Sequence, residues 1–482
     1  MSLLLTAIMV IAMCVPVMAA GETYTITAPA TNHQYEIYQI FTGDLSGNTL
    51  SNVKWGQNGK GGTIGTAVNQ GVIDALTAVN GESDANKLAV IEQYANLTNP
   101  VATITNGNYY TAAAGYYLIK DKDASLTGQD ESYTTYIVKV VGNITIEPKS
   151  DKPSSEKKVK DINDSTGIIT GWQDSADYDI GDKVPFQLKG TVANNYDEYT
   201  TYKFVFHDKE SDGLTFDSAS VKVYVDGNEI SEGYTVNSPA SDHDTFDVVF
   251  DNLKTIPAVK AGSVITVEYF STLNANAVIG STGNPNEMHL EYSNNPNNAQ
   301  GGETGNTPDD KVIVFTYKVT ANKTDSNGNA LKGAAFALYK KDSNGDYNLV
   351  SIQNATKNNG EYTLINPDAT EFNWVGLDDG DYKIVEVVTP ARYNTMEDLL
   401  FTVTAEHEIT SADPRLTSLS GGDLFTGEVS TGTVTTNIKN YKGSELPTTG
   451  GIGTTIFYVV GVVLMLGAGV LLITKRRMSA KH

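Results

Sequence analysis

Cysteine is almost absent from this chain, and histidine and tryptophan are scarce. The 482 residues include one Cys, 6 His and 3 Trp. The single thiol, Cys14, lies inside an apolar N-terminal segment, so disulfides cannot stabilise the rest of the chain. No group of His and Cys has the spacing of metal ligands, and the sequence therefore predicts neither a metal nor another cofactor.

Positive charge is also in short supply. The 34 Lys and Arg stand against 57 Asp and Glu, which gives a net charge of -23. Such an acidic surface argues against nucleic acid as a partner and is typical of a soluble extracellular protein. No Ser-His-Asp, Cys-His or phosphate-loop arrangement is visible, so the sequence does not predict a conventional enzyme.

An apolar segment stands near each end of the chain. Residues 3–19 are apolar and are followed by Ala20 and Gly21, which predicts a secretory signal peptide over 1–20, cleaved after Ala19 or Ala20. Residues 451–474 are uncharged and largely apolar, and Lys475, Arg476 and Arg477 follow. As a helix this second segment would span ~36 Å, enough to cross a bilayer with its basic end in the cytoplasm.

Short alternating runs between turns indicate mostly β structure. Residues 221–225 (Val-Lys-Val-Tyr-Val) alternate with a period of two and lead into Asp226-Gly227-Asn228, a hairpin turn. Helical spacing is confined to two stretches, around Ile73 and around Leu88. We therefore expect an all-β protein of tandem immunoglobulin-like, Cna-type β-sandwiches, with some helix in the N-terminal domain.

Two polar joints divide the chain. One is the Pro/Ser-rich stretch 148–155, and the other is the stretch 294–310, rich in Asn, Gly and Pro. They predict domains over residues 21–150, 151–310 and 311–441, each of ordinary domain size.

A pentapeptide stands directly before the C-terminal apolar segment. It reads Leu446, Pro447, Thr448, Thr449 and Gly450. Together with the apolar span and the basic tail, it resembles the cell-wall sorting signal of Gram-positive surface proteins, here residues 446–482. The resemblance implies that a sortase cuts between Thr449 and Gly450 and that Thr449 becomes an acyl donor to peptidoglycan or to another subunit. An ordinary membrane anchor behind a chance pentapeptide is the alternative.

The predicted domains resemble those of Gram-positive major pilins, the shaft subunits of fimbriae. Residues 331–338 (Leu-Lys-Gly-Ala-Ala-Phe-Ala-Leu), 380–386 (Gly-Asp-Tyr-Lys-Ile-Val-Glu) and 437–440 (Asn-Ile-Lys-Asn) resemble a Cna B-type domain. Residues 206–208 (Phe-His-Asp) and 290–296 (Leu-Glu-Tyr-Ser-Asn-Asn-Pro) resemble the isopeptide-forming, Cna A-like domain of fimbrial subunits. The resemblance implies a structural subunit of a covalently polymerised, sortase-assembled pilus on a Gram-positive cell wall. Its implied partners are sortases, identical subunits, minor tip and basal pilins, and peptidoglycan.

A wall-anchored monomeric adhesin that binds a host surface ligand is the second hypothesis. Such a protein would be expected to carry a further, larger ligand-binding domain, and none is apparent in the sequence. A lysine in the first interdomain joint favours the shaft subunit instead.

Pilins of this kind form Lys–Asn isopeptide bonds in their own domains, promoted by an acidic residue. In the third domain, period two places Lys323, Glu386 and Asn440 on the apolar faces of their strands. Burial lowers the pKa of an amine and raises that of a carboxyl, so a neutral Lys could attack the Asn side-chain carbonyl while the acid moves protons. The alternative is that all three face solvent at strand edges.

The corresponding set in the middle domain is less sharply defined by its pattern. Asp208 shares a face with Tyr202, Phe204 and Phe206, which marks it as the buried acid. Lys157 is in phase with Val159, and its neighbour Lys158 is the alternative. Asn286 and Asn294 share one face of their strand, and the resemblance favours Asn286.

Lys149 is the expected acceptor for polymerisation. Shaft pilins end their first domain in a Tyr-Pro-Lys segment, whose lysine receives the C-terminal threonine of the next subunit. This chain has Glu147, Pro148 and Lys149, so the aromatic position departs from that pattern. Lys152, three residues further on, is the competing acceptor.

The sorting motif predicts that the mature protein is anchored through Thr449. Either replacing Thr449 by Ala or deleting the tail should remove the protein from cell-wall extracts, because no acyl donor would remain. The Thr449→Ala protein should stay in the membrane fraction through residues 451–474, whereas the protein without its tail should appear in the medium. Immunoblots of wall, membrane and medium fractions measure this, and unchanged wall attachment in both variants would contradict the sorting signal.

Overall fold

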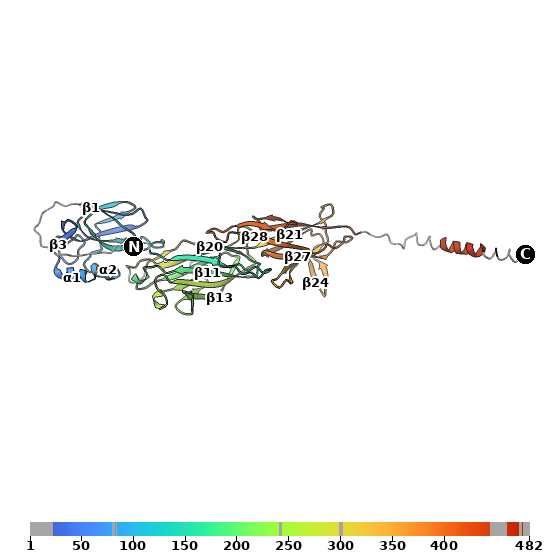
Figure 1. Ribbon diagram of the computed structural model, residues 1–482, viewed down its shortest axis with the longest axis horizontal. Coiled ribbons are helices and arrows are strands. Elements are labelled where there is room, and N and C mark those ends of the chain that lie inside the picture. Colours follow the sequence, from blue (N-terminus) through green and yellow to red (C-terminus); the bar gives the residue numbers. More distant parts are fainter. Residues whose placement is uncertain are drawn as a thin grey trace.

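The computed structural model describes residues 23–79, 82, 84–149, 151–240, 243–297, 302–443, 460–471 and 475. Three β-sandwich domains follow one another along the long axis of the molecule (Figure 1). This confirms the predicted fold class. Helices α1 (Gln70–Ala78) and α2 (Asp84–Glu92) lie in the first domain at the positions that helical spacing predicted.

The first domain packs its larger sheet on both faces. One face covers the three-stranded sheet β5-β1-β8, and the other faces α1 and α2. Alternation along β2 explains this, because Tyr35 and Ile37 enter one core while Tyr38 and Ile40 enter the other. The strands are β1 (Thr23–Thr27), β2 (Gln34–Ser46), β3 (Thr49–Trp55), β4 (Ala102–Thr105), β5 (Tyr109–Ala113), β6 (Gly115–Asp121), β7 (Thr135–Val140) and β8 (Ile144–Thr145).

The middle domain is a sandwich of a seven-stranded and a five-stranded sheet. The first has the order β10-β20-β18-β12-β16-β15, with β19 beside β18, and the second has the order β14-β13-β17-β11-β9. Aromatic side chains fill the core between them, among them Phe186, Phe204 and Tyr269. The elements are β9 (Ser154–Val159), β10 (Ser175–Asp177), β11 (Lys183–Thr191), η1 (Tyr196–Glu198), β12 (Phe204–Glu210), β13 (Leu214–Val225), β14 (Asn228–Ile230), β15 (Thr235–Asn237), β16 (Phe246–Phe250), η2 (Leu253–Thr255), β17 (Val264–Leu273), β18 (Asn284–Ser293), β19 (Thr304–Asn306) and β20 (Asp310–Phe315).

The third domain pairs the sheets β26-β21-β31-β30 and β23-β22-β27-β28-β29. Its first strand, β21, and its last, β31, are parallel neighbours, so both ends of the domain meet in one sheet. The strands are β21 (Tyr317–Asp325), β22 (Ala335–Lys341), β23 (Tyr347–Gln353), β24 (Ala355–Asn358), β25 (Glu361–Leu364), β26 (Glu371–Leu377), β27 (Gly380–Val388), β28 (Leu399–His407), β29 (Leu416–Ser420), β30 (Thr426–Glu428) and β31 (Thr433–Asn440).

The second domain boundary differs from the predicted one. Residues 304–306 form β19 and residues 310–315 form β20, and both belong to the large sheet of the middle domain. The change of domain therefore falls at Thr316, between β20 and β21. Composition pointed to residues 294–310 because β19 is a short polar strand beside β18, which reads as a linker.

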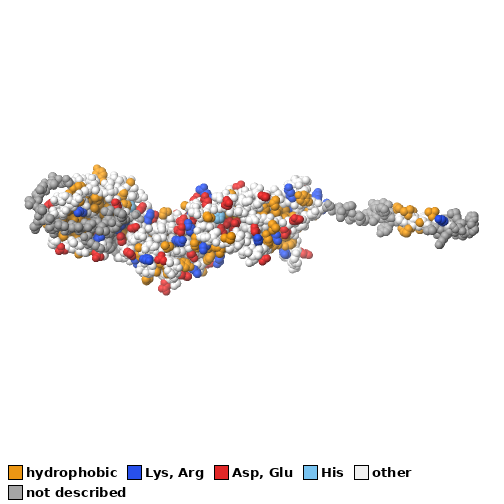
Figure 2. Space-filling model, viewed as in Figure 1, with side chains coloured by type: hydrophobic (Ala, Val, Ile, Leu, Met, Phe, Trp, Pro, Cys, Tyr) orange, Lys and Arg blue, Asp and Glu red, His pale blue; other side chains and the backbone are white. Residues whose placement is uncertain are grey.

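Figure 2 shows acidic and basic side chains scattered over the visible face of the three domains. Residues 460–471 are helical, and most of their apolar side chains are exposed. Within the described part of the chain, no helix has the length and apolar character needed to cross a membrane. The predicted signal peptide, the sorting pentapeptide and part of the predicted membrane segment lie outside the described residues.

Candidate functional site

Three polar side chains meet in the core of the third domain. Lys323 is on β21, Asn440 is on the parallel neighbour β31, and Glu386 is on β27 of the facing sheet. Asn440 pairs with Asp325, two residues beyond Lys323, so the lysine and the asparagine point into the same core one step apart. The side chains of Lys323 and Glu386 are fully buried. The structure thus brings together the three residues that period two assigned to the core.

Their geometry suits attack of the amine on the amide. Lys323 Nζ lies 2.5 Å from Asn440 Oδ1 and 3.5 Å from Glu386 Oε1. The Asn440 side-chain amide donates to both carboxylate oxygens of Glu386, at 2.8 and 2.9 Å. The acid therefore contacts the nitrogen that would leave as ammonia. Burial lowers the pKa of Lys323, against the opposing effect of Glu386, and this favours the neutral, nucleophilic amine.

A second set lies between the sheets of the middle domain. Lys157 on β9, Asp208 on β12 and Asn286 on β18 are all completely buried. Lys157 Nζ contacts Asp208 Oδ2 directly and lies 3.1 Å from the Tyr269 hydroxyl. Burial lowers the pKa of Lys157 and raises the pKa of Asp208, so both changes favour a proton on the acid and a neutral amine.

Two residues that the sequence analysis did not name complete the middle set. The Tyr269 hydroxyl donates to Asp208 at 2.9 Å and accepts from Asn286 Nδ2 at 2.9 Å, so it links the acid to the amide. Asn286 Nδ2 also lies 3.4 Å from Glu210 Oε1. Burial, aided by Asp208, raises the pKa of Glu210 to about 8. Period two could have identified Glu210, because it follows Asp208 by two positions on the same face of β12.

Lys158 and Asn294, the alternatives to Lys157 and Asn286, have other partners. Lys158 Nζ pairs with Asp174 at 2.5 Å and with Glu156 at 3.5 Å. Asn294 donates from its amide to the carbonyls of Leu126 and Glu131, both at 3.1 Å, and so ties the middle domain to the first. Lys157 and Asn286 are therefore the lysine and asparagine that the structure places beside Asp208.

Lys149 lies at the joint between the first and middle domains. Its Nζ is 2.9 Å from Glu198 Oε2 of the middle domain, and its side chain is 20% exposed. Lys152, the competitor, pairs with Asp130 at 2.6 Å and is 38% exposed. Each amine is thus ion-paired across or beside the joint and remains partly accessible, more so in Lys152 than in Lys149.

Family models match three parts of the chain. The "Gram-positive pilin backbone subunit 2, Cna-B-like domain" matches residues 180–296. The "LPXTG cell wall anchor motif" matches residues 438–479, and the "prealbumin-like fold domain" matches residues 317–415. The chain belongs to the Gram-positive backbone pilins. This family model describes the middle domain of this pilin as Cna-B-like, which corrects the predicted Cna A-like type.

Two streptococcal comparisons extend over most of this pilin. It is 27% identical over 404 residues to the trypsin-resistant surface T6 protein of Streptococcus pyogenes serotype M6. The aligned region covers 68% of this chain and 70% of that protein. The solved T6 backbone pilin of the same serotype is described as a modular three-domain structure. It superposes with a TM-score of 0.53 at 20% identity, over 89% of this chain and 100% of that one, and so shares the fold.

The geometry of the third domain predicts a covalent link between Lys323 and Asn440 that depends on Glu386. Glu386→Gln should leave both side chains free, because an amide cannot exchange protons with the amine and the leaving group. The two residues lie 117 positions apart, and a cross-link over so long a loop is worth about 4–5 kcal/mol by analogy with disulfides. The thermal midpoint of the domain should then fall by on the order of 10 °C.

Peptide mapping by mass spectrometry measures this link as a branched peptide that joins the two strands. Glu361→Gln, on the exposed face of β25, is the matched control and should retain the branched peptide. A branched peptide in Glu386→Gln as abundant as in the unaltered protein would contradict the assignment.

Proposed function

We propose that this pilin is the backbone subunit of a covalently polymerised, sortase-assembled pilus on a Gram-positive cell wall, with an isopeptide bond in each of its middle and third domains. The match of the middle domain to a pilin backbone subunit, in a chain that ends in a wall-anchor motif, is the observation that carries the proposal. The two buried Lys–acid–Asn sets support the bonds.

In the third domain the reaction needs no group beyond the three side chains. The neutral Lys323 amine attacks Cγ of Asn440, and a new Nζ–Cγ bond forms. The bond from Cγ to Nδ2 breaks, and Nδ2 leaves as ammonia with a proton that Glu386 passes from the lysine. The reaction replaces the side-chain amide of Asn440 with an amide between Lys323 and Asn440, so no oxidant or cofactor is consumed. The reaction occurs once per chain and is maturation rather than turnover.

In the middle domain two acids, Asp208 and Glu210, would share the role that Glu386 has in the third domain. Asp208 contacts the lysine and takes its proton, and Tyr269 passes a proton toward the Asn286 nitrogen. Glu210 lies on the amide side. Asn286 Oδ1 and Glu210 Oε2 are both buried without a hydrogen-bond partner. A protonated Glu210 can supply that hydrogen bond after a small rotation and so stabilise the negative charge that develops on the oxygen.

Subunits would be linked at the joint between the first and middle domains, where Lys149 lies. A sortase would transfer the acyl group of Thr449 from one subunit to Nζ of Lys149 on the next. Because Lys149 is paired with Glu198, that ion pair must open and the amine must lose a proton before attack. Glu198 ends η1 on the middle domain, so opening this pair also loosens the contact between the first two domains.

The division between two acids predicts that Glu210 is needed as well as Asp208. Glu210→Gln should slow or abolish formation of the middle-domain bond, because its carboxyl proton is lost while its shape is kept. Intact mass at successive times after synthesis measures the rate as loss of one ammonia molecule. Glu287→Gln, beside Asn286 on β18, is the control and should mature normally. Normal maturation of Glu210→Gln would leave Asp208 as the single acid.

Polymerisation through Lys149 makes a separate prediction. Lys149→Ala should abolish the detergent-resistant ladder of subunits in wall extracts, yet leave a folded, wall-anchored monomer with both internal bonds. Lys152→Ala is the matched variant and should still give ladders. Ladders that persist in Lys149→Ala and vanish in Lys152→Ala would move the acceptor to Lys152, and ladders in both would contradict polymerisation through this joint.

A further inference from the structure

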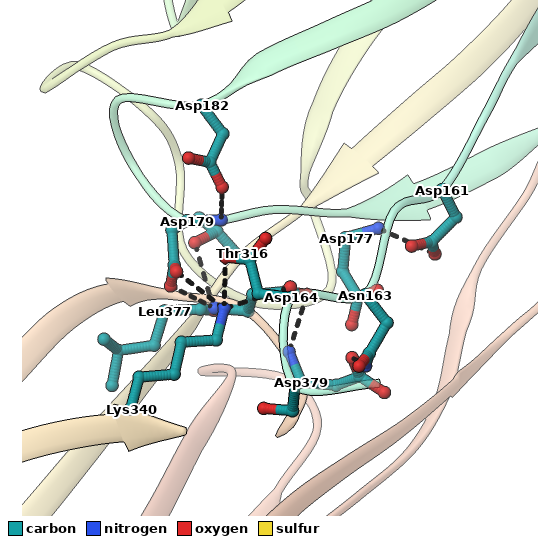
Figure 3. Close-up of polar contacts among 12 residues, drawn as sticks. Asp161, Asn163, Asp164, Asp177, Asp179, Asp182, Thr316, Lys340, Leu377 and Asp379 are labelled. Carbon is teal, nitrogen blue, oxygen red and sulfur yellow. Dashed lines mark hydrogen bonds and ion pairs between the residues drawn. The ribbon is translucent and has the colours of Figure 1, made fainter. Parts of the chain in front are cut away.

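The joint between the middle and third domains is crowded with carboxylates, as Figure 3 shows. The middle domain contributes residues on the loop after β9 and around β10, and the third domain contributes the turn between β26 and β27. The acids are Asp161, Asp164, Asp177, Asp179, Asp182, Asp378 and Asp379. Among the described residues, Lys340 and His407 are the cations that form ion pairs with this group.

Lys340 neutralises one half of the cluster. Its Nζ lies 2.6 Å from Asp179, 3.1 Å from Asp164 and 3.2 Å from Asp378. Burial disfavours the charge on this lysine, yet the surrounding acids raise its pKa above the ordinary value. Lys340 is therefore a protonated ion-pair partner, unlike Lys157 and Lys323, whose pKa values burial lowers.

Three acids of the cluster, Asp177, Asp378 and Asp379, are neutralised less completely, although Lys340 also pairs with Asp378. One oxygen each from Asp177, Asp378 and Asp379 lie within 4.8 Å of one another. His407 Nε2 is 3.7 Å from Asp177 and shares its charge with Asp161, also at 3.7 Å. In the described part of the chain Asp379 forms no ion pair, and its Oδ1 accepts a hydrogen bond from Asn163.

Two buried atoms beside these acids point to a missing ligand. Asp177 is 2% exposed, and its Oδ2 has no hydrogen-bond partner. The hydroxyl of Tyr317, a fully buried residue at the start of the third domain, faces the Asp177 carboxyl, but neither atom has a partner with ordinary hydrogen-bond geometry. A carboxylate oxygen and a hydroxyl left without partners in a dry site are costly, unless something else satisfies them.

The donor set selects a hard divalent cation. All the atoms that converge are oxygens, three of them from carboxylates, and one imidazole is already engaged with Asp161. Calcium accepts an irregular set of six to eight oxygens at about 2.3–2.6 Å, whereas magnesium requires a near-octahedral set at about 2.0–2.1 Å. Three carboxylates spread over two domains, of which Asp379 is only half-buried, fit calcium better.

We propose that Asp177, Asp378 and Asp379 bind a calcium ion that fastens the middle domain to the third. Asp177 comes from β10, and the other two come from the turn before β27, so the ion is shared by the two domains. The Tyr317 hydroxyl and water molecules supply further oxygens. Bound calcium removes the repulsion between three neighbouring carboxylates and stiffens the joint alongside the Lys340 ion pairs.

Calorimetry on the purified full chain tests the site. With calcium chloride at neutral pH we expect one ion bound per chain and a rise of several degrees in the thermal midpoint, reversed by a chelator. Asp177→Asn with Asp379→Asn should abolish both effects. Asp413→Asn, an exposed acid at the same joint that pairs with Lys311, is the control and should bind calcium normally.

If the double variant does not fold, Asp379→Asn alone replaces it, because Asp379 is the least buried of the three acids. Terbium luminescence sensitised by tyrosine then gives a second readout, and it should fall in this variant. Absence of calcium binding at millimolar concentration, binding that survives the Asp substitutions, or equal stabilisation by magnesium chloride would each overturn the proposal.

Discussion

The structure depends on keeping a lysine amine, a carboxyl group and an asparagine amide together in a dry core. Water would hold the lysine protonated, and an ammonium group has no lone pair with which to attack an amide. The β-sandwich supplies the dryness, because strand alternation delivers one side chain from each of several strands to the same interior point. In the third domain these are Lys323, Glu386 and Asn440, and in the middle domain Lys157, Asp208 and Asn286. Burial that would be a liability for separate charged groups becomes the condition for the proposed chemistry.

The positions of the two Lys–acid–Asn sets determine how the proposed bonds would resist pulling force along the pilus. If subunits are joined from Thr449 to Lys149, tension enters at the first joint and leaves at the C-terminus, so it crosses the middle and third domains and bypasses the first. Lys157 lies on the first strand of its domain, and Lys323 and Asn440 lie on the first and last strands of theirs. The proposed bond of the third domain would thus join its first and last strands directly. The proposed bond of the middle domain would join its first strand to β18, so the load would still cross the pairing of β20 with β18. The acid-rich joint between these domains, with its Lys340 ion pairs and proposed calcium, lies on the same path.

Sequence periodicity predicted the parts of this account that depend on a single strand. It assigned Lys323, Glu386, Asn440 and Asp208 to inner faces, because an inward polar residue stands out among apolar neighbours. It did not separate Lys157 from Lys158 or Asn286 from Asn294 by itself, because the final choice depends on what the facing sheet presents. Glu210 and Tyr269 were not named although both follow an inner-face period. The boundary at Thr316 and the carboxylates of the second joint depend on residues brought together from distant segments, which no local pattern reveals.

The intact mass of the unaltered, purified protein tests the central claim most directly. Each Lys–Asn bond releases one ammonia molecule, so the account predicts a mass below that of the mature sequence by two ammonia molecules. Fragmentation should locate one loss between the segments that hold Lys157 and Asn286, and the other between those that hold Lys323 and Asn440. A mass equal to that of the mature sequence, from protein that is folded and fully matured, would contradict it.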